Sequence, residues 1–203
     1  MNHLDPGLLD LLREVAEEMI EATEADGHLV TKALAQHDAF SLSGAPRSSL
    51  RRALIAQAAQ RRASQVGLHT ERKSMDSIEI THLDGLVETL VRLKSVKVNA
   101  QGEYVAVCGA DSTLLKVDGE KLAVEEKWIL GYTVTDLDTI EDIFVAKIRG
   151  FIDGKPVKLI LGPPISLRRT TPTPGGFVSR DEELPGFETH TDEGTDDGLG
   201  DLG

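Results

Sequence analysis

The chain has 203 residues, of which 40% are hydrophobic and 28% charged, a composition typical of one moderate globular domain or two small ones. Its single cysteine, Cys108, excludes an internal disulfide and favours a reducing compartment, so we expect a cytoplasmic protein. We expect no signal peptide and no membrane partner, because the N-terminus is acidic and no uncharged apolar run approaches the roughly 20 residues of a membrane span.

The net charge of −12 is concentrated near the C-terminus. Residues 181–203 contain nine acidic residues and no Lys or Arg, whereas the other 180 residues contain 25 acidic and 22 basic residues. The body of the chain is therefore nearly neutral. Its overall charge neither favours nor excludes nucleic acid as a partner.

The N-terminal segment predicts an amphipathic helix. Asp5 suits the N-cap and Pro6 the first helical position, and Gly27 is expected to end the helix. We expect its acidic arc to be a solvated face. A short second helix is expected over residues 28–38, followed by a loop. The apolar arc of the first helix contains Leu8, Leu11, Leu12, Val15, Met19 and Ala22.

A third helix is predicted from near Pro46 to about Val66, within a stretch that has no Asp or Glu. Leu54 and Ala58 share an arc with its arginines, so we expect the arginine stems to lie along the edges of a packed stripe. The candidate polyanion-binding residues on this arc are Arg47, Arg51, Arg61 and Arg62.

Strand patterns begin at Ser77 and continue to about residue 161. The strongest signal is residues 143–161, where two apolar runs flank Asp153-Gly154, a dipeptide suited to a two-residue hairpin turn. A second such hairpin is expected at Asp118-Gly119, and residues 135–142 could hold a helical turn. Seven or eight strands with regular turns predict a mostly antiparallel barrel or sandwich.

The chain after Gly162 is rich in Pro, Gly and Thr, and residues 177–203 are predicted to be disordered. Leu184 and Phe187, which lie among acidic residues, are candidates for docking into a basic-rimmed groove of a partner. The alternative is a tail that only improves solubility. The predicted fold class is α+β, with an N-terminal helical segment (1–70), an antiparallel β domain (71–167), and a linker with a disordered acidic C-terminal tail (168–203).

The sequence lacks the common sequence motifs of enzymes. No phosphate-binding glycine loop, no G-x-S-x-G motif and no metal-ligand spacing among the six histidines occurs, so we expect no metal and no cofactor. Cys108 ends an apolar run, which favours a small buried side chain over a reactive thiol.

One arrangement carries possible chemistry. Asp111 follows a predicted strand, and Glu125-Glu126-Lys127 begins fourteen residues later. This resembles the PD-(D/E)xK nuclease superfamily over about 20 residues. The resemblance implies that Asp111 and Glu125 are metal ligands and that Lys127 is the catalytic base or orients the water. No Pro precedes Asp111, and strand-like residues 128–134 stand where the superfamily has a helix.

We therefore expect a non-catalytic intracellular binding, adaptor or assembly protein that acts through protein–protein contacts or self-association. A structural component of a larger particle is equally compatible with the sequence. The alternatives are a nucleic-acid-binding accessory protein that uses the arginine-rich helix and a metal-dependent nuclease.

Overall fold

A computed structural model describes residues 4–72, 77–109, 112–115 and 124–168, all within one unit, Met1–Arg169. Several predictions lie outside these residues: the disordered tail with Leu184 and Phe187, the Asp118-Gly119 hairpin, and Asp111.

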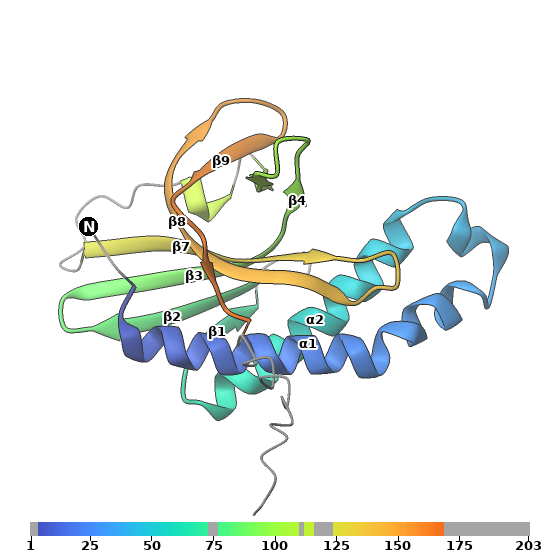
Figure 1. Cartoon of the computed structure of the whole chain (residues 1–203), viewed down its shortest axis with the longest axis horizontal. Coiled ribbons are helices and arrows are strands. Elements are labelled where there is room, and N and C mark those ends of the chain that lie inside the picture. The colour runs from blue at the N-terminus through green and yellow to red at the C-terminus, as the bar shows by residue number, and fades with distance from the viewer. Residues whose placement is uncertain (1–3, 73–76, 110–111, 116–123, 169–203) are drawn as a thin grey trace, which may run out of the picture. The chain divides into compact units, whose positions relative to one another are not determined.

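The N-terminal helices form an antiparallel hairpin along one side of the sheet (Figure 1). Helix α1 (Pro6–Leu34) begins as predicted, because the Asp5 carboxylate accepts a 2.7 Å hydrogen bond from the Leu8 amide. A short 3-10 helix, η1 (Asp38–Ser41), leads to α2 (Ala45–Gln65), which has Pro46 in its first turn. The prediction of this arginine-bearing helix is confirmed.

The described strands form a mixed sheet of eight strands, in the order β1-β2-β3-β7-β8-β9-β6, with β10 paired to β8. The sheet is mostly antiparallel, as predicted, but β3 and β7 run parallel. The strands are β1 (His69–Arg72), β2 (Ile78–Asp84), β3 (Val87–Ser95), β6 (Val107–Cys108), β7 (Val124–Val134), β8 (Ile140–Ile152), β9 (Val157–Leu161) and β10 (Ile165–Ser166).

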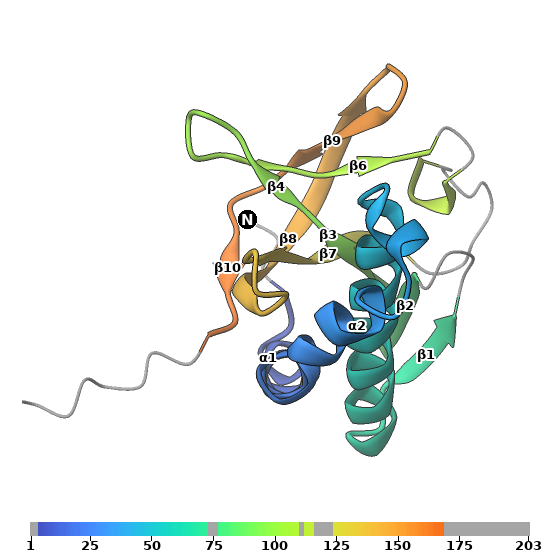
Figure 2. The ribbon, with the colours of Figure 1, turned by 90° about the vertical axis from the view of Figure 1, so that its right-hand side faces the viewer.

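The sheet curls into a half-barrel (Figure 2). The prediction of a barrel or sandwich therefore captures only the curled, mostly antiparallel part of the architecture. A separate two-stranded ribbon, β4 (Lys97–Val98) with β5 (Tyr104–Val105), and the 3-10 helix η3 (Thr113–Leu115) lie between β3 and β7 in the chain.

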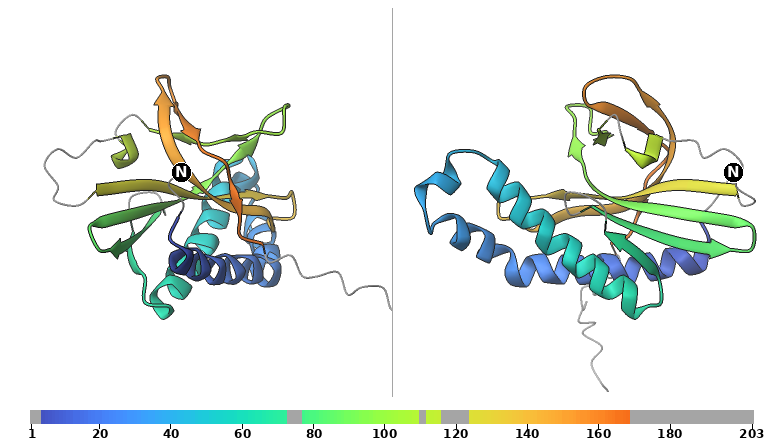
Figure 3. Two further views of the ribbon diagram at one scale, coloured as in Figure 1. Left: turned by 60° about the vertical axis from the view of Figure 1, so that its left-hand side comes forward. Right: turned by 180° about the vertical axis from the view of Figure 1, so that it is seen from behind.

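Strand alternation divides the apolar residues between two cores. The first core lies between the helices and the sheet, where Trp128, Leu130 and Tyr132 of β7 meet residues of α1 and α2. The second lies inside the curl, where Ile129 of β7 meets Phe144 of β8. The helices thus cover one face of the sheet, and the returning strands cover the other (Figure 3).

The prediction that Gly27 ends the first helix is wrong, as is the separate helix over residues 28–38. Helix α1 continues to Leu34, and Gly27 is buried within it. A Cβ atom at Gly27 would lie 3.2 Å from the carbonyl oxygen of Asp138, in the turn between β7 and β8. The glycine therefore marks a close approach of two backbones, which the sequence pattern does not distinguish from a helix end.

The β8–β9 hairpin is present, but its turn differs from the prediction. Strand β8 ends at Ile152 and β9 begins at Val157, so residues 153–156 connect them in place of a two-residue turn. The helical turn expected in residues 135–142 is also absent. Thr135 and Thr139 close a tight turn there, in which the Thr135 amide donates a 2.9 Å hydrogen bond to the Thr139 carbonyl oxygen.

Gly131 makes room for the largest side chain of the second core. A Cβ atom at Gly131 would lie 2.6 Å from the Phe144 ring, and the Tyr104 ring stacks on Phe144 with centroids 4.1 Å apart. Phe144 is buried, and the stacked tyrosine limits how far its ring can move. This position therefore requires glycine for steric reasons.

Gly131→Ala is expected to lower the free energy of unfolding by about 1–3 kcal/mol, because the added methyl group overpacks the second core. Gly44→Ala is a matched control, since nothing lies within 4 Å of a Cβ atom there. Denaturant unfolding of both variants measures the difference. Equal midpoints for the two variants would contradict this account of Gly131.

Candidate functional site

The four candidate arginines of α2 all contact groups of the same chain. Arg61 pairs with Glu18 and Arg62 with Glu14, so these two arginines join α2 to the acidic arc of α1. The arc predicted to be a solvated face is therefore partly a helix–helix contact. The Arg61 side chain remains 58% exposed.

Arg47 and Arg51 converge on Asp138. The Asp138 carboxylate lies 3.4 Å from Arg47 Nε and 3.2 Å from Arg51 Nη1, and its side chain is 0% exposed. Arg47 also donates a 3.0 Å hydrogen bond to the Thr31 hydroxyl of α1. A buried carboxylate requires such partners, because leaving an unpaired charge out of water costs several kcal/mol.

Helix α1 holds the turn that carries Asp138. The Thr23 hydroxyl is buried; it donates to the Ile20 carbonyl oxygen at 2.9 Å and accepts from the Ile140 amide at 3.3 Å. Asp138 has φ +63°, a conformation that Asp and Asn tolerate better than most residues. Asp138 is not among the predicted site residues, although residues 135–139, which contain two Asp and two Thr between strands, are a turn signal.

Tyr132 of β7 is buried beside this group of charges. Burial raises the pKa of Tyr132 to about 12, although the nearby positive charges of Arg51 and Arg52 and a hydrogen bond with Ser95 act to lower it. Tyr104 lies on the other side of the sheet. Its pKa is also raised to about 12, chiefly because its hydroxyl donates a hydrogen bond to Asp142.

Two of the three residues implied by the nuclease resemblance lie together. Glu125 and Lys127 project from the same face of β7, with Lys127 Nζ 3.0 Å from Glu125 Oε1. Lys127 also donates to the Thr113 carbonyl oxygen at 3.3 Å. Asp111 lies outside the described residues. Among the residues that are described, no group of three or more His, Cys, Asp or Glu is placed to hold a metal ion.

A second buried ion pair adjoins Thr113. Arg92 of β3 pairs with Glu79 of β2, its direct cross-strand neighbour, and also donates to the Thr113 hydroxyl. Arg92 and Glu79 are both buried. These contacts attach η3 to the sheet, and inside the curl the charge of Arg92 is balanced by that of Glu79.

Apolar side chains are exposed in several places, among them the turns at Leu86 and Leu137, and two of these places have several such residues on neighbouring elements. One is the end of the helical hairpin, where Leu42 is 84% exposed. The other is the sheet lobe formed by β6, β8 and β9, where Ile152 is 57% exposed. Neither surface could be found from the sequence, because the spacing of apolar residues does not show which of them remain exposed after the chain has folded.

Comparison of the chain with known protein families, with curated proteins and with solved structures found no match. In the described part of the chain, no helix combines the length and the apolar character needed to cross a membrane.

Asp138→Asn is expected to lower the free energy of unfolding by about 1.5–3 kcal/mol, because it removes the charged partner of Arg47 and Arg51. Asp138→Ala should cost about 1–2 kcal/mol more, since Ala tolerates the positive φ less well. Asp136→Asn, at an exposed position of the same turn, is the control. Equal stability of Asp138→Asn and wild type in urea unfolding would refute the proposed role.

Both tyrosines of the chain should ionise near pH 12 in the folded protein, whereas the unfolded chain ionises near pH 10. Their contribution to stability is therefore complete below pH 10 and is lost as the pH rises from 10 to 12. Tyrosinate absorbance as a function of pH measures both pKa values directly. Asp142→Ala should lower the pKa of Tyr104 and leave that of Tyr132 unchanged. A native titration with half its amplitude at pH 10 would show that one tyrosine is not held as described.

Proposed function

We propose that the chain is a non-catalytic protein-binding or assembly protein, with the end of its helical hairpin as a contact surface. This end, residues 28–50, is called the helical arm; it comprises the last turns of α1, all of η1 and the first turns of α2. The observation that carries the proposal is the set of exposed apolar side chains on the arm: Leu29, Phe40, Leu42 and Leu50.

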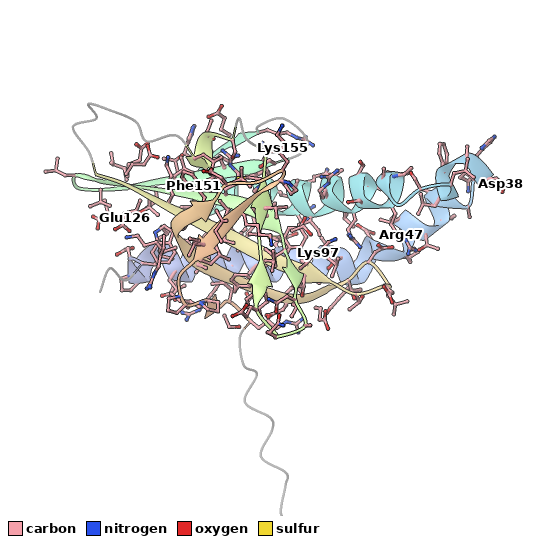
Figure 4. All side chains as sticks on the ribbon, turned by 90° about the horizontal axis from the view of Figure 1, so that it is seen from above. Asp38, Arg47, Lys97, Glu126, Phe151 and Lys155 are labelled. Atoms are coloured by element: carbon pink, nitrogen blue, oxygen red, sulfur yellow. The ribbon has the colours of Figure 1, made fainter. Side chains whose placement is uncertain are left out.

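The helical arm contributes little to either core. Val30 is its one buried hydrophobic residue among the described side chains, and it belongs to neither core cluster. The arm extends past the sheet, with Asp38 and Arg47 along it (Figures 1 and 4). Burying one such apolar side chain in a partner contributes roughly 1.5–3 kcal/mol to the free energy of binding. Four exposed apolar side chains on one arm can therefore stabilise a complex.

The alternative functions find less support. Polyanion binding by Arg47, Arg51, Arg61 and Arg62 would compete with their contacts to Glu14, Glu18 and Asp138. A nuclease reaction would require Glu125 and Lys127 to exchange their ion pair for a metal ion and a water molecule. Docking of a partner to Leu184 and Phe187 remains a proposal from the sequence alone.

Photocrosslinking in cells that express the protein naturally tests the arm. A crosslinking amino acid at position 40 should form discrete adducts with a partner protein or a second copy, distinguished by mass. The same amino acid at Gln57, exposed on α2 outside the arm, should form none. Leu42→Ser should reduce the adducts at position 40 roughly tenfold, because it removes apolar contact area. Adducts that form equally at both positions, or survive Leu42→Ser, would refute this function.

A further inference from the structure

The lobe of the sheet opposite the helices has an outward face with an unusual composition. In β9, Val157 and Leu159 point into the second core, so Lys158 and Ile160 point outward. The register places Lys158 directly between Val107 of β6 and Ile152 of β8. Lys158 thus has exposed aliphatic side chains beside it on both neighbouring strands, Val107 and Ile152, and Ile160 two residues along its own strand.

The same face continues onto the β4–β5 ribbon. Ala106 is fully buried, and its carbonyl oxygen accepts from the Leu159 amide at 2.9 Å, so its neighbours Val105 and Val107 both face outward. Val105 pairs with Lys97 across the ribbon. We call this surface the outer β face; its residues are Lys97, Val105, Val107, Ile152, Lys158 and Ile160.

The charges of the outer β face are all positive at these positions. Lys155, in the connection between β8 and β9, adds a further cation at its border, and Figure 4 shows the lobe from above with Lys97 and Lys155 labelled. Among the residues that the structure describes, the nearby acids are Asp153, in the same connection, and Glu103, which accepts a 2.9 Å hydrogen bond from the Asn99 side chain. The face therefore combines aliphatic surface with an excess of positive charge, in a chain of net charge −12.

We infer that the outer β face docks an acidic segment of a partner protein, whose carboxylates contact Lys97 and Lys158 and whose apolar side chains cover Val107, Ile152 and Ile160. Charge complementarity selects the acids, and aliphatic burial supplies the affinity. Single-stranded nucleic acid fits less well, because none of the six residues is aromatic, and Phe151, which is exposed beside them, pairs with Leu159 and so lies on the opposite face of the strands. Strand addition at β6 is also disfavoured, since Lys94 Nζ already donates to the Val107 carbonyl oxygen at 3.2 Å.

Selection from a display library of random peptides on the full chain tests this inference. The enriched peptides should combine Asp or Glu with Leu, Ile or Phe. Lys158→Glu should weaken their binding roughly tenfold or more, because it reverses the central charge. The double variant Ile152→Ser with Ile160→Ser should have an effect of similar size, because it removes aliphatic surface.

The matched control is Leu86→Ser, which removes an exposed apolar side chain in the β2–β3 turn. It should bind the selected peptides as wild type does, and thermal unfolding confirms that each variant is folded. A library without enrichment, peptides without acids, or equal binding to Lys158→Glu would overturn the inference. So would full displacement of the peptides by a single-stranded oligonucleotide at equal concentration, which would reassign the face to polyanions.

This test is independent of the helical arm, because the outer β face shares no residue with it. Selected peptides that lose binding to Leu42→Ser, and not to Lys158→Glu, would locate recognition on the arm and overturn the outer β face as a site. Concentration-dependent sedimentation that Lys158→Glu abolishes would instead assign the face to a second copy of the chain.

Discussion

The buried carboxylate of Asp138 is the contact through which the helices and the sheet constrain each other. It lies in a turn of the sheet, its partners Arg47 and Arg51 lie on α2, and its backbone packs against Gly27 of α1. Because a desolvated charge without partners is strongly unfavourable, this turn holds both helices at once. This contact fixes the first turns of α2, whereas Arg61 and Arg62 fix its later turns through Glu18 and Glu14 of α1.

The two faces of β7 explain why the molecule has two different interiors. Trp128, Leu130 and Tyr132 meet the helices in an apolar layer. On the opposite face, Lys127 and Ile129 point into the curl. Lys127 forms an ion pair with Glu125, and Ile129 packs in the second core. Gly131 belongs to this second face, and its missing side chain gives Phe144 the space that the curl requires.

The sequence predicted those elements whose signals are local. Asp5 and Pro6 start α1, and the alternation of residues 157–161 identifies β9 in the β8–β9 hairpin. Two of the wrong predictions are local, in the turns at residues 135–142 and 153–156, and the others concern contacts between distant residues. Gly27 breaks the helical pattern in the sequence, yet its role is set by a turn more than 100 residues later. The parallel pairing of β3 with β7 could not be predicted either, because the spacing of apolar residues indicates where strands lie in the chain but not which strands pair.

The candidate sites divide in the same way. Helical spacing placed Arg47, Arg51, Arg61 and Arg62 on one arc, but their acidic partners come from α1 and from a sheet turn. The pair Glu125 and Lys127 could be predicted because residues two apart in a strand share a face. The outer β face could not be predicted, because its residues come from five strands whose pairing and register are known only in the folded chain.

Helix α1 has 29 residues, and its last turns belong to the helical arm beyond the cores. Segments with few buried contacts open locally at a much lower free energy than the global unfolding transition requires. Substitutions at the exposed residues Leu29, Phe40, Leu42 and Leu50 therefore change the surface of the arm and leave both cores intact. Arg47 is the exception within the arm, because it also contacts Asp138 and so belongs to the junction between the helices and the sheet.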